Sequence, residues 1–374
     1  MAESLVVGEP AKHRRLELLD LLRFCAAIMV VVFHWLFNGI DNGKVSTIDF
    51  GSFAPVAIYG VYGVHLFFLI SGFVIADSAR GRTAGQFVVS RAIRLFPAYW
   101  VAMIITTLVV NGWGSEAMRV TPLQFLANTT MVPAAFGQPA VDGVYWTLTV
   151  ELTFYFLVLV VLVCGLGRFL DLVFPAWAML MLAVTVVAPD VSLLPYLGGY
   201  YSLFAAGAIF AAIRRRGVSV FGASGLAAAV SAAIIFVIRD VERFNRTHSL
   251  TISTSVAVAL LAIFLFFMAS LCIPRADRIK LPFSRPISDL TYPVYLLHAH
   301  IGYTILGKFA TEENVVLVYS LMFCGLLITA ALLHFAVEVL PKRFWRSSFG
   351  LLRGPFDAVQ DAVESLRQRI RARN

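Results

Sequence analysis

The first apolar segment of this 374-residue chain, residues 15–35, carries Asp20 and Arg23 near one end and His34 near the other. Arg23 and His34 are about three helical turns apart, or about 16 Å along a helix axis, so they share one face at different depths. Asp20 precedes Arg23 by one turn on that face. Ionisable groups inside a membrane are costly and are usually functional. Because an imidazole has a pKa near 6.5, His34 can accept a proton from a hydroxyl group near neutral pH.

Glu151 and Tyr155 form a second polar pair, four residues apart in the apolar segment 144–166, and therefore share a helix face. A lone carboxylate inside a span is costly unless it faces a cavity or a partner. We predict that Glu151 orients the His34 imidazole and that Tyr155 donates a hydrogen bond to a carbonyl oxygen or to a second substrate. The alternative is that Glu151 pairs with a buried cation such as Arg23 for structural reasons.

Arg91 and Arg94 lie one turn apart just before the apolar segment 95–113. Two guanidinium groups on one helix face can bind phosphate groups through paired hydrogen bonds. Anchoring of the cytoplasmic helix end by positive charge explains the same pattern equally well.

Several other residues give weaker indications of structure or function. The Ser71-Gly72 pair predicts close approach between two helix backbones. His65 lies near the middle of the second apolar segment, without a predicted role. His298 and His300 are two residues apart, so on one helix they would point to different faces. We therefore predict no metal site.

The composition identifies an integral membrane protein: 59% of the residues are hydrophobic, 14% are charged and the mean hydropathy is +0.82. A soluble protein carries about 25% charged residues. The net charge of +8 does not indicate nucleic-acid binding, because the basic residues fall between the apolar segments.

The segments long enough to cross a membrane predict an all-α polytopic bundle of about ten helices. The alternation of Lys and Arg between loops places the N- and C-termini in the cytoplasm. The expected spans are 16–38, 50–76, 95–113, 144–166, 172–188, 195–213, 218–238, 250–273, 287–307 and 315–340.

Two further segments complete the predicted organisation, in which residues 1–345 form the membrane domain and 346–374 a cytoplasmic tail. In the tail, an apolar stripe at helical spacing predicts an amphipathic helix on the inner leaflet; a homodimer seam or a solvated tail are the alternatives. The segment 114–143 is expected to cap or line an external opening. The stripe consists of Phe356, Val359, Val363, Leu366 and Ile370.

Five motifs in order resemble the membrane-bound acyltransferase-3 family, over Leu16–His300 and on to the last span. They are R-x10-H from Arg23, GVxLFFxxSGF from Gly63, RxxRxxPAYW from Arg91, WxLxxExxxY from Trp146, and TYPxYLLH from Thr291.

The resemblance implies about ten helices, a cytoplasmic acyl-CoA donor and, in many members, an acceptor at the outer face. His34 falls on the proposed catalytic histidine of the family, and Arg23 on its paired basic position. Arg91 and Arg94 match the cytoplasmic arginine motif. The acidic-aromatic motif falls on Glu151 and Tyr155. His65 departs from the pattern, because many members have an acidic residue there.

These observations predict a multi-pass O-acyltransferase of the bacterial plasma membrane. It would move an acyl group, for which acetyl from acetyl-CoA is the common family choice, to a hydroxyl of a cell-envelope or exported carbohydrate. His34 would act as the general base or carry the acyl group itself. The alternatives are a small lipophilic acceptor, such as a macrolide or lipid-linked sugar, and a transporter. No metal cofactor and no nucleic-acid partner are expected.

Overall fold

The computed structural model describes residues 16–373, and these form a helical bundle without a strand. α1 (Glu17–Phe33) continues through a π-helical turn, His34–Asn38, into α2 (Gly39–Asp41). The other helices that build the bundle are α3 (Ala54–Ala57), α4 (Gly63–Ala79), α5 (Ala84–Trp113), α6 (Pro122–Asn128), α7 (Trp146–Val163), α8 (Leu170–Val187), α9 (Tyr201–Arg216), α10 (Val220–Thr247), α11 (Thr254–Ser270), α12 (Ser284–Leu297), α13 (Ala299–Phe309) and α14 (Val315–Leu333).

The all-α polytopic membrane fold is confirmed. Among the described residues, seven helical stretches are long and apolar enough to span a membrane, and α11 is a shorter apolar helix. The predicted spans 195–213 and 287–307 are also helical, although α9 has 16 residues and the latter is divided at His298 into α12 and α13. The count of ten spans and the cytoplasmic termini stay predictions.

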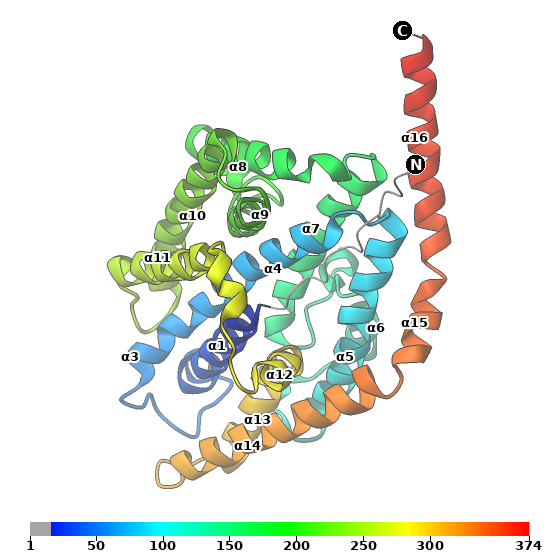
Figure 1. Ribbon diagram of the computed structural model, residues 1–374. Coiled ribbons are helices and arrows are strands. Elements are labelled where there is room, and N and C mark those ends of the chain that lie inside the picture. The colour runs from blue at the N-terminus through cyan, green and yellow to red at the C-terminus, as the bar shows by residue number, and fades with distance from the viewer. Residues whose placement is uncertain (1–15, 374) are drawn as a thin grey trace.

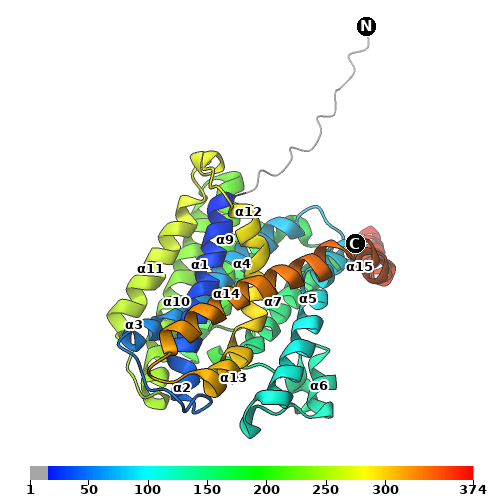
Figure 2. The same ribbon diagram turned by 90° about the horizontal axis from the view of Figure 1, so that it is seen from below.

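α1 lies in the interior of the bundle, where it packs against α4 and α12 (Figures 1 and 2). α4 in turn packs against α9, and α9 against α8 and α10. One polar cluster ties three of these elements together, because Asp171 of α8 accepts hydrogen bonds from Arg80, after α4, and from Arg215 of α9. The arrangement presents one face of α1 to α4 and α12.

α5 begins eleven residues earlier than the predicted span, because Thr83 and Gln86 form a capping box at its start. Arg91 and Arg94 therefore lie about two to three turns inside a 30-residue helix, not at its beginning. The first turns of α5 are amphipathic, whereas the hydropathy signal of the span starts only at Leu95.

The backbones of α4 and α9 make close contact, as the Ser71-Gly72 pair predicted. A Cβ atom added at Gly72 would lie 2.1 Å from the Phe204 carbonyl oxygen, and one added at Gly207 would lie 1.9 Å from that of Leu69. Both distances are far below contact distance, so only glycine permits this crossing.

Substitution of Gly207 by alanine is expected to force α4 and α9 apart and to destabilise the fold. Loss of this packing should lower the midpoint of thermal unfolding in detergent by several degrees or reduce the folded yield. The control is Gly112→Ala, because a Cβ atom at Gly112 meets nothing within 4 Å. Equal thermal stability of both variants would contradict the predicted steric role.

The segment 114–143 is ordered and folds against α5. It contains α6, which starts with a Thr121–Gln124 capping box. Tyr99 and Trp100 of α5 donate hydrogen bonds to its backbone at Asn128 and Thr129. The extended stretch after α6 carries Asp142 into the bundle, so this loop contributes to the interior as well as to the surface.

The C-terminal tail forms α15 (Lys342–Gly350) and α16 (Arg353–Arg373), along the edge of the bundle beside α5 (Figure 1). Asp357 and Gln360 accept hydrogen bonds from the backbone N–H groups of Gly85 and Ala84, each 2.8 Å long. These are N–H groups in the first turn of α5, which have no partners within that helix. α16 thus caps α5 from outside.

The apolar stripe of α16 is divided between two environments. Phe356 and Val363 are half-buried, whereas Val359, Leu366 and Ile370 have exposed fractions of 51%, 57% and 52%. The exposed part leaves a face free for the inner leaflet or for a second copy. Both interpretations of the tail stay predictions. The boundary between the membrane domain and the tail at residue 345 also stays a prediction.

Replacing Asp357 with alanine is expected to loosen α16 from α5, by about 1 kcal/mol from a lost cap. The Thr83 hydroxyl, the Gly85 N–H and Arg353 hold the pKa of Asp357 below its ordinary value. Docking is therefore stabilised above pH 4, and this contribution disappears as the pH falls through the folded-state pKa.

Limited proteolysis of the tail across pH 3 to 7 measures this effect. Asp361→Ala is the matched control, because Asp361 is exposed on the same helix. If the tail of the Asp357 variant were as protected at pH 7 as that of the control, the capping role would be wrong.

Candidate active site

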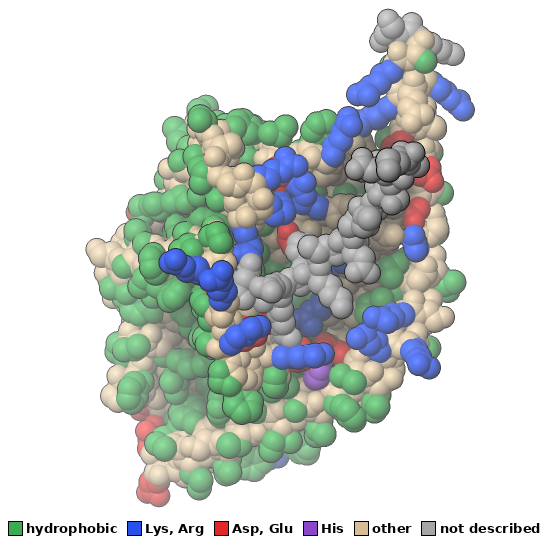
Figure 3. All heavy atoms as spheres, in the orientation of Figure 1, with side chains coloured by type: hydrophobic (Ala, Val, Ile, Leu, Met, Phe, Trp, Pro, Cys, Tyr) green, Lys and Arg blue, Asp and Glu red, His purple; other side chains and the backbone are tan. Residues whose placement is uncertain are grey.

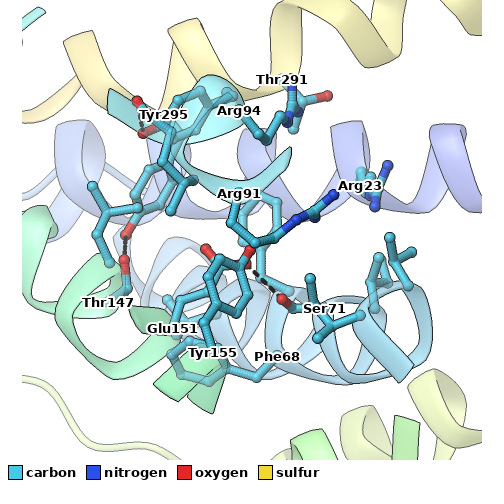
Figure 4. Close-up of a pocket in the computed structure, with 18 residues that line it drawn as sticks. Arg23, Phe68, Ser71, Arg91, Arg94, Thr147, Glu151, Tyr155, Thr291 and Tyr295 are labelled. Carbon is cyan, nitrogen blue, oxygen red and sulfur yellow. Dashed lines mark hydrogen bonds between the residues drawn. The ribbon is translucent and has the colours of Figure 1, made fainter. Parts of the chain in front are cut away.

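A cavity of about 130 Å³ lies where α1, α4, α5, α7 and α12 meet (Figure 4). The predicted residues Arg23, Arg91, Arg94, Glu151 and Tyr155 all line it. Three guanidinium groups and one carboxylate give the lining an excess of two positive charges. The cavity is therefore suited to an anionic or strongly polarised ligand. Its other polar lining residues are Ser71, Thr147, Thr291, Tyr292 and Tyr295.

Glu151 is the acceptor at the centre of this lining. Its Oε1 accepts a hydrogen bond from Ser71 Oγ at 2.5 Å and another from Tyr155 Oη at 2.6 Å. Ser71 comes from α4, so the carboxylate joins α4 to α7 beside the α4–α9 contact. Two hydroxyl donors compensate for the transfer of the carboxylate into the bundle.

The three arginines are held in different ways. Arg23 pairs with Asp20 at 3.9 Å, and the side chain of Arg23 is 25% exposed. The Arg91 guanidinium lies 5.9 Å from the centre of the Tyr155 ring, and that of Arg94 lies 5.5 Å from the centre of the Tyr292 ring. Such ring contacts hold a cation in place while leaving N–H groups available for a ligand.

His34 begins the π-helical turn at the other end of α1. Single π-helical turns within α-helices occur frequently at functional sites. Here the turn places Asn38 beside the imidazole: Asn38 Nδ2 lies 3.2 Å from His34 Nδ1 and donates a 2.8 Å hydrogen bond to Tyr303 Oη. Tyr303 Oη lies 2.5 Å from His34 Nδ1. The imidazole is thus held by one side chain from its own helix and one from α13.

The predicted contact between Glu151 and His34 is not made. Glu151 lies with the arginines of the cavity and binds Ser71 and Tyr155, whereas His34 binds Tyr303 and Asn38. The reason is geometric: Glu151 lies more than one turn after the start of α7, toward the end of the bundle that contains Arg23. The predicted orientation of His34 by Glu151 is therefore wrong, although both residues belong to neighbouring parts of the bundle.

Two aromatic side chains connect the cavity with His34. Tyr295 lines the cavity, and its ring centre lies 5.6 Å from that of His298. The His298 ring centre lies 5.0 Å from that of His34. Thr147 fixes Tyr295 through a 2.6 Å hydrogen bond between their hydroxyl oxygens. The rings of Tyr295 and His298 thus link the basic cavity to the surroundings of His34, which we call the His34 compartment.

Beyond His34, a buried carboxylate organises the far side of the site. Asp142 is fully buried and accepts hydrogen bonds from the backbone N–H groups of His300 and Val144. The Lys44 ammonium donates to His300 Nε2 at 2.8 Å, and burial lowers the pKa of Lys44. This corner brings the loop before α7, the loop after α2 and the start of α13 together.

Sequence reasoning assigned no role to Asn38, Tyr303, Tyr295 or Asp142. Asn38 was detectable, because it follows His34 by four residues on the same helix. Asp142 carries the usual signal of a helix cap, an acidic residue immediately before a helical start. Tyr303 and Tyr295 gave no distinguishing signal, because tyrosines are common in buried helices.

His65 lies outside the cavity lining, within 4.8 to 6.0 Å of the ring centres of Tyr62, Tyr200 and Phe236. Its two ring nitrogens are buried and have no hydrogen-bond partner in the described part of the chain. Nothing in the structure assigns it a role. Across residues 16–373, no group of three or more His, Cys, Asp and Glu side chains is placed to hold a metal ion.

Comparison with known proteins gives one family and two relatives. A family model described as an acyltransferase domain matches residues 16–335. Nodulation protein 10 of Rhizobium leguminosarum bv. viciae is 35% identical over 158 residues, which is 36% of this chain and 41% of the relative. The exopolysaccharide production protein ExoZ of Rhizobium meliloti (strain 1021) is 31% identical over 104 residues, 26% of this chain and 32% of the relative.

The matches thus span less than half the length of each curated relative. No solved structure matches the chain. The family model, by contrast, covers all the helices that build the cavity and the His34 compartment. The chain belongs to the acyltransferase-3 family.

Proposed function

We propose that this protein transfers an acyl group from cytoplasmic acyl-CoA to a hydroxyl of a cell-envelope or exported carbohydrate. The observation that carries the proposal is the joined site: a positively charged cavity at one end of α1 and a hydrogen-bonded histidine at the other. The match to an exopolysaccharide production protein favours a carbohydrate acceptor. The family match supports acyl transfer as the reaction class.

The donor side of the reaction is assigned to the end of the bundle that carries Arg91 and Arg94. Figure 3 shows Lys and Arg side chains gathered around a hollow on one face of the molecule. Since cytoplasmic ends of spans carry the excess of Lys and Arg, we assign this face to the cytoplasm of a bacterial plasma membrane. A cavity of about 130 Å³ is too small for a nucleotide. The phosphates of CoA would therefore stay at the arginine rim, while the narrow chain with the thioester enters.

His34 supplies the base in this reaction. The acceptor hydroxyl attacks the thioester carbonyl, an O–C bond forms, and the C–S bond breaks to release the CoA thiol, which receives the proton. When His34 Nδ1 donates to Tyr303 Oη, Nε2 is the basic nitrogen that removes the hydroxyl proton. In the second route, His34 is acylated first and then transfers the group. As the donor enters, Arg23 can neutralise a CoA phosphate or polarise the thioester.

The proposal is tested by incubating membranes that contain the protein with acetyl-CoA labelled in the acetyl group. We expect label in an alkali-labile ester on carbohydrate, and mass spectrometry should find fewer acyl groups on the surface glycans of a deletion strain than on those of the parent. Identical glycan profiles, together with no CoA-dependent label in any acceptor, would contradict the proposal and favour a transporter instead.

A further inference from the structure

A second cavity, of about 340 Å³, lies between α13 and α14. Its lining is mainly apolar and includes Trp35, Leu297, Ile301, Ile305, Met322 and Leu326. Neither Lys, Arg, Asp nor Glu lines it. The volume falls within the range of about 300 to 1,000 Å³ that small-molecule sites occupy. We call this cavity the α13–α14 groove.

The groove opens toward the surroundings of the bundle. Leu321 and Phe309, which line it, have exposed fractions of 63% and 59%. α14 belongs to the least buried of the seven candidate spans, with 17% of its apolar window covered by protein. In a membrane, these exposed apolar side chains face lipid, so the groove is accessible sideways from the bilayer.

The polar residue of interest in the groove is His298. Its Nδ1 lies 2.7 Å from the carbonyl oxygen of Tyr295, and because a carbonyl only accepts, Nδ1 must carry a hydrogen. In the neutral ring, Nε2 is therefore an acceptor. Nε2 is buried without a partner, and His298 is 1% exposed. An unpaired buried acceptor is unfavourable, so a hydroxyl donor that reached Nε2 would be stabilised.

His298 also connects the groove with the reaction centre, because its ring lies next to that of His34. We propose that the α13–α14 groove binds the hydrocarbon chain of a neutral glycolipid, whose sugar hydroxyl donates to His298 Nε2 beside His34. The absence of cations from the lining excludes a phosphate in the groove itself. The inference rests on the proposed function for the identity of the second substrate, whereas the binding site itself is independent of it.

Photolabelling of the full-length protein in lipid nanodiscs tests the site directly. The probe is decyl β-glucoside with a diazirine at the end of the decyl chain. After irradiation, peptide mapping should place the label on α13 and α14 residues that line the groove, and excess unlabelled decyl β-glucoside should remove it.

The decisive variant is Gly325→Leu, because Gly325 lines the groove and a Cβ atom there meets nothing within 4 Å. The Cβ atom has room, and the larger side chain would occupy space in the groove, so labelling should fall at least fivefold. The control is Ile328→Leu, on the same helix at an exposed position outside the lining. His298→Leu should remove the preference for the glucoside over a decyl probe without hydroxyl groups.

Equal labelling of the Gly325 and Ile328 variants, or label spread evenly around the lipid-facing surface, would overturn the inference. Competition by decanoyl-CoA but not by unlabelled decyl β-glucoside would also overturn it, since the groove would then hold the donor chain. His34→Ala should leave the photolabelling unchanged. Labelling in the groove without acyl transfer would refute the proposed function and leave the groove assignment intact.

Discussion

Replacement of His34 by alanine is expected to lower acyl transfer by two to four orders of magnitude, the usual contribution of a positioned acid–base group. In the proposed reaction, the two side chains that hold the His34 ring cannot replace its basic nitrogen. Tyr303 and Asn38 hold the ring but are poor bases near neutral pH. The measurement is the initial rate of label transfer from acetyl-CoA to the acceptor, in membranes with equal amounts of protein.

His248→Ala is the matched control, because the His248 ring stacks on Phe244, away from both cavities. It should retain nearly the full rate. Omitting the acceptor then distinguishes the two routes: stable label on the protein that disappears in His34→Ala supports an acyl-histidine. A His34→Ala rate near that of the unmodified protein would refute the assigned role.

Replacement of Arg23 by alanine is expected to weaken the use of acyl-CoA by about tenfold to a hundredfold. Hydrogen bonds to a charged group contribute about 1.5 to 3 kcal/mol, which corresponds to that range. Arg23→Lys should recover part of the loss, since it keeps the charge but not the planar fork of donors. The measurement is KM and kcat for acetyl-CoA, determined separately.

The separation of these constants identifies what Arg23 binds. A higher KM with unchanged kcat indicates binding of the CoA phosphates, whereas a lower kcat indicates polarisation of the thioester. Arg119→Ala is the control, because Arg119 pairs with Glu116 at the surface of the segment 114–143. If Arg23→Ala and Arg119→Ala both showed the same kinetics as the unmodified protein, Arg23 would have no role in donor use.

Much of the fold was predictable, because the apolar segments are long and small residues indicate where helices approach closely. The ten predicted stretches all contain helix, and the Ser71-Gly72 pair correctly indicated a close helix contact. The break at His298 was not predicted, because the apolar segment 287–307 is continuous in the sequence. This break matters, because it separates α12 from α13 and allows His298 and His300 to make different contacts.

The site was partly predictable. Five of the six predicted site residues line one cavity. Spacing on a helix predicted only the pairs within one helix, such as Glu151 with Tyr155. Spacing within one helix could not predict how residues of different helices lie relative to one another. Glu151 was assigned to His34 when its partners are Ser71 and Tyr155. The depth of a residue in one helix relative to another depends on tilt and on where each helix begins.

The two rings of Tyr295 and His298 have a consequence for the membrane as a barrier. In the proposed reaction, one substrate arrives from each side, so an open passage between them would conduct protons and ions. The Tyr295 and His298 rings, with centres 5.6 Å apart, lie between the arginine-lined cavity and His34 and would narrow any such passage. Transfer of a small acyl group through this layer would thus be compatible with an intact proton gradient. The same pair of rings that joins the two compartments would then also limit the leakage of protons and ions through the protein.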